Sequence, residues 1–378
     1  MSFYPPTLPL SHLPTLHTAS HATPPPYSHM FPSTLLAALA VVAGAAGVAS
    51  AAEGPCDILV AAGNPCVAAH STVRALYAKY DGPLYNVTRS SDGKSANVGL
   101  LSAGGFADKA AHDAFCSKLD CVISNVFDQS PMLNHLGQRH KLINASRHSI
   151  TVGKDKTPVY GMWFDPGFGY HVDKTTGIAT GNDPESIYAV MSGQNINGGC
   201  CFDYGNSESD NTDDGCGTME AIYFGNAHWH GNTGGGKVDG PWAGADLEQG
   251  MYYGGGEQTQ VNNNSQPLTH EFVSLVLKGR EDGFTIKGGD ATSGTQATMY
   301  DGPRPVAKIA GTCGKTGTYQ PMRKQGAIIL ATGGDNSNSA KGNFYEGFMA
   351  TGYASDATDA AIQANIIAVG YSGWNAPQ

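Results

Sequence analysis

The sequence predicts an all-β protein in which short strands, joined by tight turns, form a sandwich. The first observation is composition: 50 of the 378 residues are glycine, only 14% are charged, and asparagine, serine and threonine are plentiful. Glycine supplies the positive φ angles that tight turns need. The second observation is a series of short apolar runs without regular helices between them, which favours a sandwich over a sheet built from βαβ units.

Four apolar or alternating runs are predicted to be strands because glycine, asparagine or aspartate bounds each of them. They are residues 272–278, 284–287, 327–331 and 366–369. Three other stretches have apolar residues at helical spacing or a helix start. They are residues 65–80, residues 106–116 and a segment that begins after Ser355. The prediction is therefore a mostly β domain with a few short helices.

Residues 1–51 are predicted to be an N-terminal extension and a secretory signal peptide, followed by one domain over residues 52–378. From Met30 the chain has an apolar run that ends in Ala49-Ser50-Ala51, a small-x-small sequence typical of a cleavage site. Alanine and glycine dominate this run, which makes a transmembrane anchor the weaker interpretation. The start of translation is either Met1 or Met30. We therefore expect a secreted, extracellular protein.

The formal net charge of −10 argues against nucleic acid as a partner, because phosphate binding needs a basic surface. Neutral sugars impose no such requirement. No membrane partner is expected once the apolar N-terminal run is interpreted as a signal peptide. The charge thus excludes one class of partner and leaves uncharged substrates open.

Eight cysteines in a secreted chain indicate disulfides. Cys56 and Cys66, like Cys116 and Cys121, are close enough in sequence to close small loops. No pair of CxxC motifs is present, so a structural zinc site is not expected. Three Asn-x-Ser/Thr sequons are compatible with glycosylation of a secreted protein. They begin at Asn86, Asn144 and Asn263.

The adjacent cysteines Cys200 and Cys201 allow two arrangements. Each can bond to a distant partner, or the two can bond to each other in a strained ring that its surroundings must hold. Such a ring would present a rigid sulfur surface that can pack against the apolar face of a sugar. The residues alone leave both arrangements open.

Several carboxylates lie in apolar or glycine-rich settings that suit acid–base chemistry. Asp246 and Glu248 lie on a segment predicted to be extended, where a two-residue period places both side chains on one face. Asp335 follows the predicted strand 327–331, after two glycines that let a ligand approach. Glu220 and Glu346 are further candidates, each near aromatic residues.

Glycoside cleavage needs one carboxylic acid to protonate the leaving oxygen and one carboxylate to attack or to activate water. Spacing alone does not choose the pair among these candidates. The alternative for each of them is a capped turn or a satisfied hydrogen-bond acceptor.

The motif His228-Trp229-His230 has two interpretations as well. Two histidines at i and i+2 on a strand can bind a metal, but no third ligand has a recognisable spacing, so no metal is expected. Trp229 is either a stacking platform for a sugar or simply a packed side chain.

Several long segments resemble family 54 of the glycoside hydrolases, the α-L-arabinofuranosidase B type. The resemblance extends from about residue 54 to residue 371 in the order of the family. The segments that carry it are Gly54-Pro-Cys-Asp-Ile-Leu59, Tyr160-Gly-Met-Trp-Phe-Asp-Pro-Gly-Phe-Gly-Tyr170, Gly199-Cys-Cys-Phe-Asp-Tyr-Gly-Asn206, Met219-Glu-Ala-Ile-Tyr-Phe-Gly-Asn226, Gly240-Pro-Trp-Ala-Gly-Ala-Asp-Leu-Glu248, Gly326-Ala-Ile-Ile-Leu330 and Gly333-Gly-Asp-Asn-Ser-Asn338.

This resemblance implies a lectin-like (concanavalin-like) sandwich of antiparallel sheets and an exo-acting hydrolase that releases terminal arabinofuranose with retention of configuration. It places the nucleophile on Glu248 and the acid/base on Asp335. The sugar contacts that it implies are Cys200, Cys201, Trp229, Asp246, Gln249, Gly334 and Asn336. The disulfides that it implies are Cys56–Cys66, Cys116–Cys121 and Cys200–Cys201. No cofactor and no metal are implied.

The chain departs from the family pattern at several places. Gln249 stands where the family usually has asparagine, and insertions surround Cys216 and Cys313. These two cysteines are the ones left over, so we predict a Cys216–Cys313 disulfide. The family's C-terminal β-trefoil sugar-binding domain is not expected within these 378 residues.

We therefore expect a monomeric hydrolase that acts on arabinose-containing polysaccharides or oligosaccharides such as arabinan and arabinoxylan. Two alternatives remain. One is an inactive lectin-like binding protein, and the other is a glycosidase with shifted sugar specificity.

Overall fold

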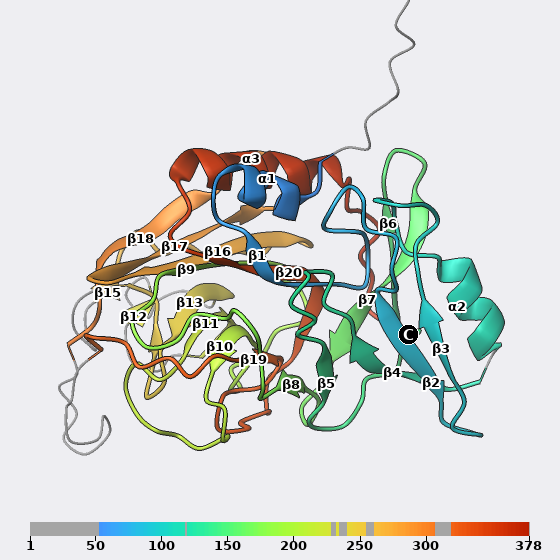
Figure 1. Cartoon of the computed structure of the whole chain (residues 1–378), viewed down its shortest axis with the longest axis horizontal. Coiled ribbons are helices and arrows are strands. Elements are labelled where there is room, and N and C mark those ends of the chain that lie inside the picture. The colour runs from blue at the N-terminus through green and yellow to red at the C-terminus, as the bar shows by residue number, and fades with distance from the viewer. Residues whose placement is uncertain are drawn as a thin grey trace, which may run out of the picture. The chain divides into compact units, whose positions relative to one another are not determined.

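Two large antiparallel sheets pack face to face in the computed structural model, which describes residues 53–117, 119–227, 232–233, 240–254, 261–306 and 319–377 (Figure 1). Contacts of β11 with β9 and β16, and of β13 with β17, join the facing surfaces of the sheets. This arrangement confirms the predicted all-β sandwich. It also places the apolar core between the two layers.

The first sheet has eight strands, and β20 lies near its centre. Its main path is β18 (Ala297–Pro303), β17 (Gly283–Asp290), β16 (Val273–Arg280), β9 (Glu185–Met191), β20 (Gly342–Thr351), β7 (Thr157–Phe164) and β6 (His148–Val152). The remaining strand, β1 (Cys66–Ser71), pairs with β20. Every residue of β9 is buried, because this strand is covered on both faces.

The second sheet has ten strands and carries most of the residues discussed below. Its order is β14 (Met251–Tyr252), β13 (Trp242–Asp246), β11 (Glu220–Gly225), β10 (Asp203–Ser207), β19 (Ala327–Leu330), β8 (Tyr170–Val172), β5 (Leu136–Gln138), β4 (Cys121–Val126), β2 (Tyr85–Arg89) and β3 (Ser95–Val98). A separate parallel pair consists of β12 (Asn232–Thr233) and β15 (Val261–Asn262). Because β13, β11, β10 and β19 are neighbours, segments far apart in sequence meet at one end of this sheet.

Two of the three helices of the described residues, α1 (Pro55–Ala61) and α3 (Asp356–Ala368), lie against each other on the outer face of the first sheet (Figure 1). The third, α2 (Lys109–Cys116), packs beside β2, β3 and β7. Helix α3 begins at Ser355, whose hydroxyl accepts a hydrogen bond from the Thr358 N–H at 3.1 Å. Lys278 and Lys287 each lie 2.7 Å from the Asp359 carboxylate and join α3 to β16 and β17.

The local predictions were only partly correct. The structure confirms strands at residues 272–278, 284–287 and 327–331, and helices within 106–116 and after Ser355. The predicted helix over residues 65–80 is wrong, because its first part is strand β1, all six residues of which are buried. The predicted strand at 366–369 is also wrong, since it contains the last turn of α3. Short apolar runs that are buried on all sides do not distinguish strand from helix.

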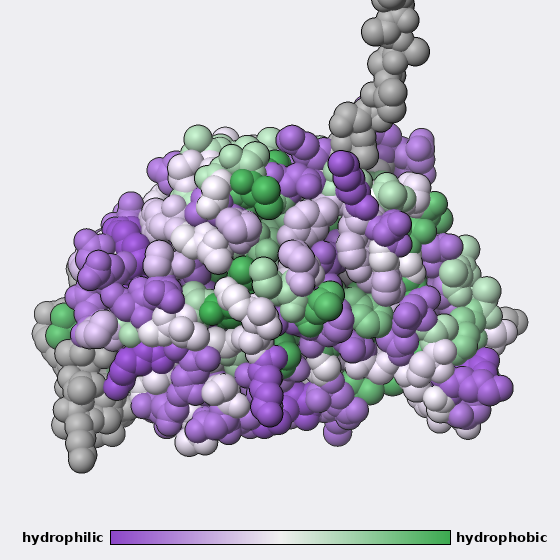
Figure 2. Space-filling view, viewed as in Figure 1, coloured by the Kyte–Doolittle hydropathy of each residue, from purple (hydrophilic) through white to green (hydrophobic). Residues whose placement is uncertain are grey.

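The surface of this domain is mixed in character. On the face drawn in Figure 2, apolar residues are interspersed with hydrophilic ones. The large apolar side chains that are exposed come from separate parts of the fold, and they are Val60, Leu101, Leu119, Leu133 and Val306. None of the described helices is long and apolar enough to cross a membrane.

Candidate active site

A pocket of about 170 Å³ opens at the end of β13, beside the loop that follows β19. It collects residues that are more than a hundred positions apart in sequence. They are Cys200, Cys201, Asp213, Asp246, Glu248, Gln249, Gly250, Met251, Gly333, Gly334, Asp335 and Ser337. Seven of the nine residues that the resemblance implies as site residues are therefore in this lining.

Asp246 is the last residue of β13, and Glu248 follows it in a turn rather than on the strand. Glu248 has φ 58° and Gln249 has φ 61°, in the left-handed region that most residues avoid. A hydrogen bond from the Glu248 N–H to Asp246 Oδ1, at 3.0 Å, closes this turn. The two carboxyl groups thus reach one pocket, but the extended segment predicted from the sequence ends between them.

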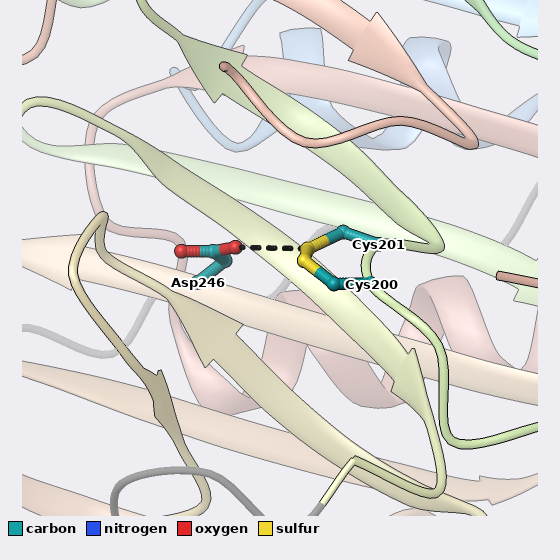
Figure 3. Close-up of side chains that lie close together, drawn as sticks. All are labelled: Cys200, Cys201 and Asp246. Carbon is teal, nitrogen blue, oxygen red and sulfur yellow. Dashed lines mark hydrogen bonds between the residues drawn. A yellow bond between two sulfur atoms is a disulfide. The ribbon is translucent and has the colours of Figure 1, made fainter. Parts of the chain in front are cut away.

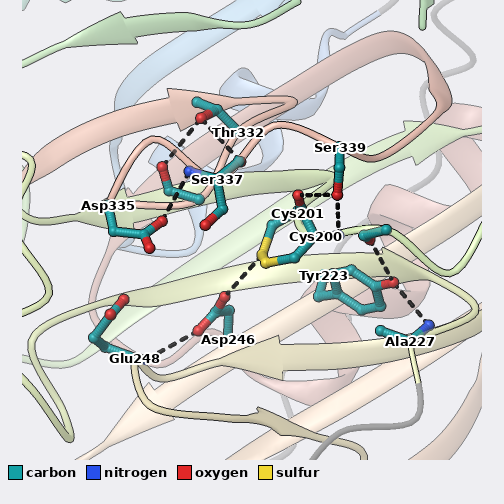
Figure 4. Close-up of a disulfide and its surroundings, with 12 residues drawn as sticks. Cys200, Cys201, Tyr223, Ala227, Asp246, Glu248, Thr332, Asp335, Ser337 and Ser339 are labelled. Carbon is teal, nitrogen blue, oxygen red and sulfur yellow. Dashed lines mark hydrogen bonds between the residues drawn. A yellow bond between two sulfur atoms is a disulfide. The ribbon is translucent and has the colours of Figure 1, made fainter. Parts of the chain in front are cut away.

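Asp335 enters the pocket from the loop after β19. One of its carboxylate oxygens accepts a hydrogen bond from the Ser337 N–H at 2.8 Å, and the side chain is exposed. Figure 4 shows the carboxyl groups of Asp335 and Glu248 pointing toward one another. These two groups are therefore placed to act on one bound ligand from different sides.

Gly334 and Asn336 flank Asp335 and differ in position. A Cβ at Gly334 would overlap the carboxylate of Glu208, so this position in the pocket wall requires glycine. Asn336 is outside the lining, and its side-chain oxygen accepts a hydrogen bond from Arg139 Nε at 2.8 Å. The structure therefore does not bring the predicted contact Asn336 into the pocket.

Cys200 and Cys201 are bonded to each other, and the peptide between them is cis. Cys201 Sγ lies 3.7 Å from Asp246 Oδ2, and Figure 3 draws this contact as a dashed line. A disulfide sulfur has no proton to donate, so Asp246 is the group that would donate in this contact. The two sulfur atoms and one carboxylate oxygen of Asp246 lie within 4.8 Å of one another, a spacing that can suit a metal. The disulfide leaves no thiolate, however, and thiolate is the form of cysteine that binds metals.

Four carboxyl groups are buried together here. The exposed fractions are 0% for Asp203, 0% for Glu208, 5% for Asp246 and 7% for Glu248. Burial, with further repulsion from neighbouring carboxylates, raises the pKa of Asp246 and that of Glu208 to about 7. Burial and the charges of Asp246, Glu208 and Asp213 raise the pKa of Glu248 to about 12. Because like charges repel in a poorly solvated site, this cluster retains protons near neutral pH.

Two acids of this cluster, Asp203 and Glu208, and the neighbouring exposed acid Asp213 were not identified from the sequence. Asp203 and Glu208 lie on β10 and directly after it, beside β11 and β19. Asp213 lines the pocket and accepts a hydrogen bond from Gln249 Nε2. The one available signal was an aspartate in an otherwise apolar segment after Cys200-Cys201, which does not reveal its neighbours.

The candidates Glu220 and Glu346 lie elsewhere and are structural. Glu220 is fully buried between Arg304 and Lys324, each 2.9 Å away. Burial alone would raise its pKa, but these two cations outweigh burial and lower the pKa to about 2. Glu346 accepts two hydrogen bonds from Arg74. Both acids are therefore partners of buried cations.

The remaining predicted residues are partly outside the described chain. The structure contains the disulfides Cys56–Cys66 and Cys116–Cys121. Cys216 is disulfide-bonded, but Cys313 lies outside the described residues, so the pairing of these two stays a prediction. His228, Trp229 and His230 also lie outside them. Among the sequons, Asn144 and Asn263 are exposed, whereas the side-chain amide of Asn86 donates to Asn97 Oδ1 at 2.6 Å.

Comparisons with known proteins agree with this geometry. A family model described as alpha-L-arabinofuranosidase B, catalytic, matches residues 55–372. A "Probable alpha-L-arabinofuranosidase B" of Aspergillus terreus is 46% identical over 335 residues, which are 85% of this chain and 63% of that protein. An "Arabinofuranosidase/B-xylosidase" of Trichoderma koningii is 45% identical over 335 residues, with the same shares covered.

Two solved structures are similar throughout the sandwich. One is a family 54 α-L-arabinofuranosidase soaked with a cyclic sulfate inhibitor, with a TM-score of 0.79, 42% identity and coverage of 85% of this chain and 66% of that one. The other is an arabinofuranosidase complexed with arabinofuranosyl-alpha-1,2-xylobiose, with a TM-score of 0.78, 42% identity and coverage of 84% and 66%.

A β-sandwich with opposed carboxyl groups in one small pocket is the arrangement expected of a glycoside hydrolase. The family match and the relatives make the assignment more specific. The chain belongs to the α-L-arabinofuranosidase B family, glycoside hydrolase family 54. It spans about three fifths of the length of the curated relatives that it matches.

Proposed function

We propose that this chain is a retaining, exo-acting α-L-arabinofuranosidase with Glu248 as nucleophile and Asp335 as acid/base. The observation that carries the proposal is the opposition of these two carboxyl groups in one pocket (Figure 4). Terminal arabinofuranose on arabinan- or arabinoxylan-type chains is the substrate class. The relatives and solved structures named above support this choice, because their names refer to arabinofuranosides.

In the first step Glu248 attacks the anomeric carbon while the protonated carboxyl group of Asp335 gives its proton to the departing oxygen. In the second step Asp335 removes a proton from water, which attacks the same carbon and releases Glu248. The anomeric configuration is inverted twice and is therefore retained. After the first step Asp335 is ionised and Glu248 is esterified, and the second step restores the proton of Asp335 and the free carboxylate of Glu248.

The size and charge of the pocket favour a single neutral sugar ring. Its volume of about 170 Å³ is smaller than the roughly 300–1,000 Å³ typical of sites for drug-sized ligands. Four of the twelve lining residues are acids, and the carboxyl groups of Asp213, Asp246, Glu248 and Asp335 would repel an anionic uronic acid. The disulfide offers an apolar surface to the sugar. Release of one terminal residue at a time follows from this shape.

Glu248 must be ionised to attack, although its surroundings raise its pKa. Two of the repelling neighbours, Asp246 and Glu208, have pKa values of about 7 and are neutral at weakly acidic pH. Their repulsion of the Glu248 charge then disappears, which favours its ionisation. The proposal therefore places the working range of the enzyme below pH 7.

The proposed activity is tested with 4-nitrophenyl α-L-arabinofuranoside and proton NMR of the first product formed. Release of the α anomer before mutarotation is expected from a retaining enzyme. Release of the β anomer would contradict the double displacement. A folded protein that binds arabinose without any turnover would instead be a carbohydrate-binding protein.

Shifted sugar specificity is a second candidate, and Gln249 is the observation that favours it. Its amide donates to Asp213 instead of remaining free for a sugar. One relative carries xylosidase as well as arabinofuranosidase in its name. Equal or greater kcat/KM on 4-nitrophenyl β-D-xyloside than on the arabinofuranoside would favour this candidate.

We also propose that the protein is secreted and acts outside the cell as a monomer. The disulfides support an oxidising compartment. Detection of the protein in culture medium, cleaved near residue 51, tests the location, and light scattering tests the oligomeric state.

A further inference from the structure

Asp203 is a buried acid behind the pocket with no assigned role. It is the first residue of β10, directly after Cys201 and Phe202, and its exposed fraction is 0%. Neither carboxylate oxygen has a hydrogen-bond donor among the described residues. An ionised carboxylate without a donor in such a place is strongly disfavoured, because nothing replaces its lost hydration.

Acidic and phenolic groups face Asp203 from each neighbouring element. They are Tyr223 on β11, Asp246 on β13, Asp335 after β19, Glu208 after β10 and Tyr253 after β14. Burial and then the charges of Asp246, Asp335 and Glu208 raise the pKa of Asp203 well above its ordinary value. The three carboxyl groups disfavour a negative charge on Asp203, and the two phenols stay neutral and supply no positive charge to offset it.

Asp203 and Asp246 are within hydrogen-bonding reach of each other. Two carboxylates cannot form that bond, because neither has a proton to donate. A proton on Asp203 satisfies one of its own oxygens and can be donated to Asp246 whether Asp246 is ionised or neutral. Asp203 is the more deeply buried of the two and is the natural holder of this proton.

We propose that Asp203 is a positioning residue that stays protonated while the enzyme works and donates its proton in a hydrogen bond to Asp246. Asp246 in turn accepts the backbone N–H of Glu248 at 3.0 Å and so holds the left-handed turn that aims Glu248. Asp203 touches no substrate, since it is not part of the pocket lining. Its effect on catalysis rests on the proposed function, whereas its protonation does not.

The protonation is tested by infrared spectroscopy on the full chain. The difference spectrum between the parent and Asp203→Asn should contain the carbonyl band of a protonated carboxylic acid at pH 5 and still at pH 8. A carboxylate band at either pH in its place would overturn the proposal. This measurement is independent of activity, so it decides about Asp203 even if the parent hydrolyses no arabinofuranoside.

The positioning role is tested by comparing Asp203→Asn with Asp203→Leu. Asparagine keeps a neutral donor toward Asp246, so kcat should stay within about threefold of the parent, with an unchanged pH profile. Leucine removes the donor, and kcat should fall by about tenfold or more. Equal losses in the two variants, or an alkaline limb that moves in Asp203→Asn, would overturn the role. If Asp203→Leu does not fold, the pH dependence of kcat in Asp203→Asn still decides. Removal of a charged Asp203 would shift the alkaline side of that pH dependence, whereas removal of a neutral one would not.

Discussion

Substitution of Glu208 by glutamine should make the domain more stable at alkaline pH but not at acidic pH. Glu208 is fully buried, and one carboxylate oxygen accepts a hydrogen bond from the Thr218 hydroxyl at 2.6 Å. The other oxygen has no partner among the described residues. Glutamine can keep the bond to Thr218 while it removes the acid. The variant therefore isolates the free energy of ionising a buried carboxyl group.

The magnitude follows from the pKa of Glu208, which burial and the charges of Asp246 and Asp214 raise from 4.5 to about 7. The folded state holds this proton between pH 4.5 and 7, whereas the unfolded state releases it. The free energy of unfolding therefore falls as pH rises through this window. At 1.36 kcal/mol per unit, the shift corresponds to about 3 kcal/mol, fully expressed above pH 7.

Urea unfolding at about pH 4.5 and pH 8 measures this effect. Relative to the parent, Glu208→Gln should gain about 3 kcal/mol more at the higher pH than at the lower one. Any constant cost of the new amide cancels in this difference. The matched control is Glu271→Gln on the surface, which should show almost no difference between the two pH values. A gain for Glu208→Gln that is equal at both pH values would refute the reasoning.

Two further predictions concern packing and pH. Gly279→Ala should destabilise the domain by roughly 2–4 kcal/mol in urea unfolding, because the new Cβ would overlap the buried carboxylate of Glu220. Gly99→Ala, whose Cβ would meet open space, is its control, and equal costs would contradict the packing argument. The kcat/KM for an arabinofuranoside should fall as pH rises through about 7, where Asp246 and Glu208 ionise and disfavour a charge on Glu248. A constant kcat/KM up to pH 9 would contradict this account.

The fold class could be predicted from composition and short apolar runs, but individual elements were less certain. Strands β16, β17 and β19 were found because turn residues bound them. Strand β1 was mistaken for helix because it is buried on all sides and shows no alternation. The run at 366–369 was mistaken for strand although Ser355 had been identified as a helix start, since α3 extends for 13 residues.

The site residues divide in a similar way. Asp246, Glu248 and Asp335 could be named as candidates because they lie in apolar or glycine-rich settings, and only the family resemblance chose among the candidates and gave them roles. Asp203 and Glu208 could not be identified from the sequence, because their place beside the other acids depends on the pairing of β10 with β11 and β19. The turn at Glu248 was also hidden, since its left-handed backbone is not encoded by glycine. Sequence patterns thus identify the acids of single segments but not the cluster that several strands assemble.

The roles of the two carboxyl groups are the central claim, and one comparison of substrates tests them directly. The measurement is kcat/KM of Glu248→Gln and Asp335→Asn on 4-nitrophenyl α-L-arabinofuranoside and on an arabinofuranosyl xylo-oligosaccharide. Asp155→Asn, an exposed acid away from the pocket, is the control.

Glu248→Gln should lose more than about 1,000-fold on both substrates, because both need the nucleophile. Asp335→Asn should lose about 100-fold or more on the oligosaccharide and much less in glycosyl-enzyme formation from the nitrophenyl substrate, whose leaving group needs little protonation. Activity that survives in Glu248→Gln, or equal losses of Asp335→Asn on both substrates, would contradict the assignment.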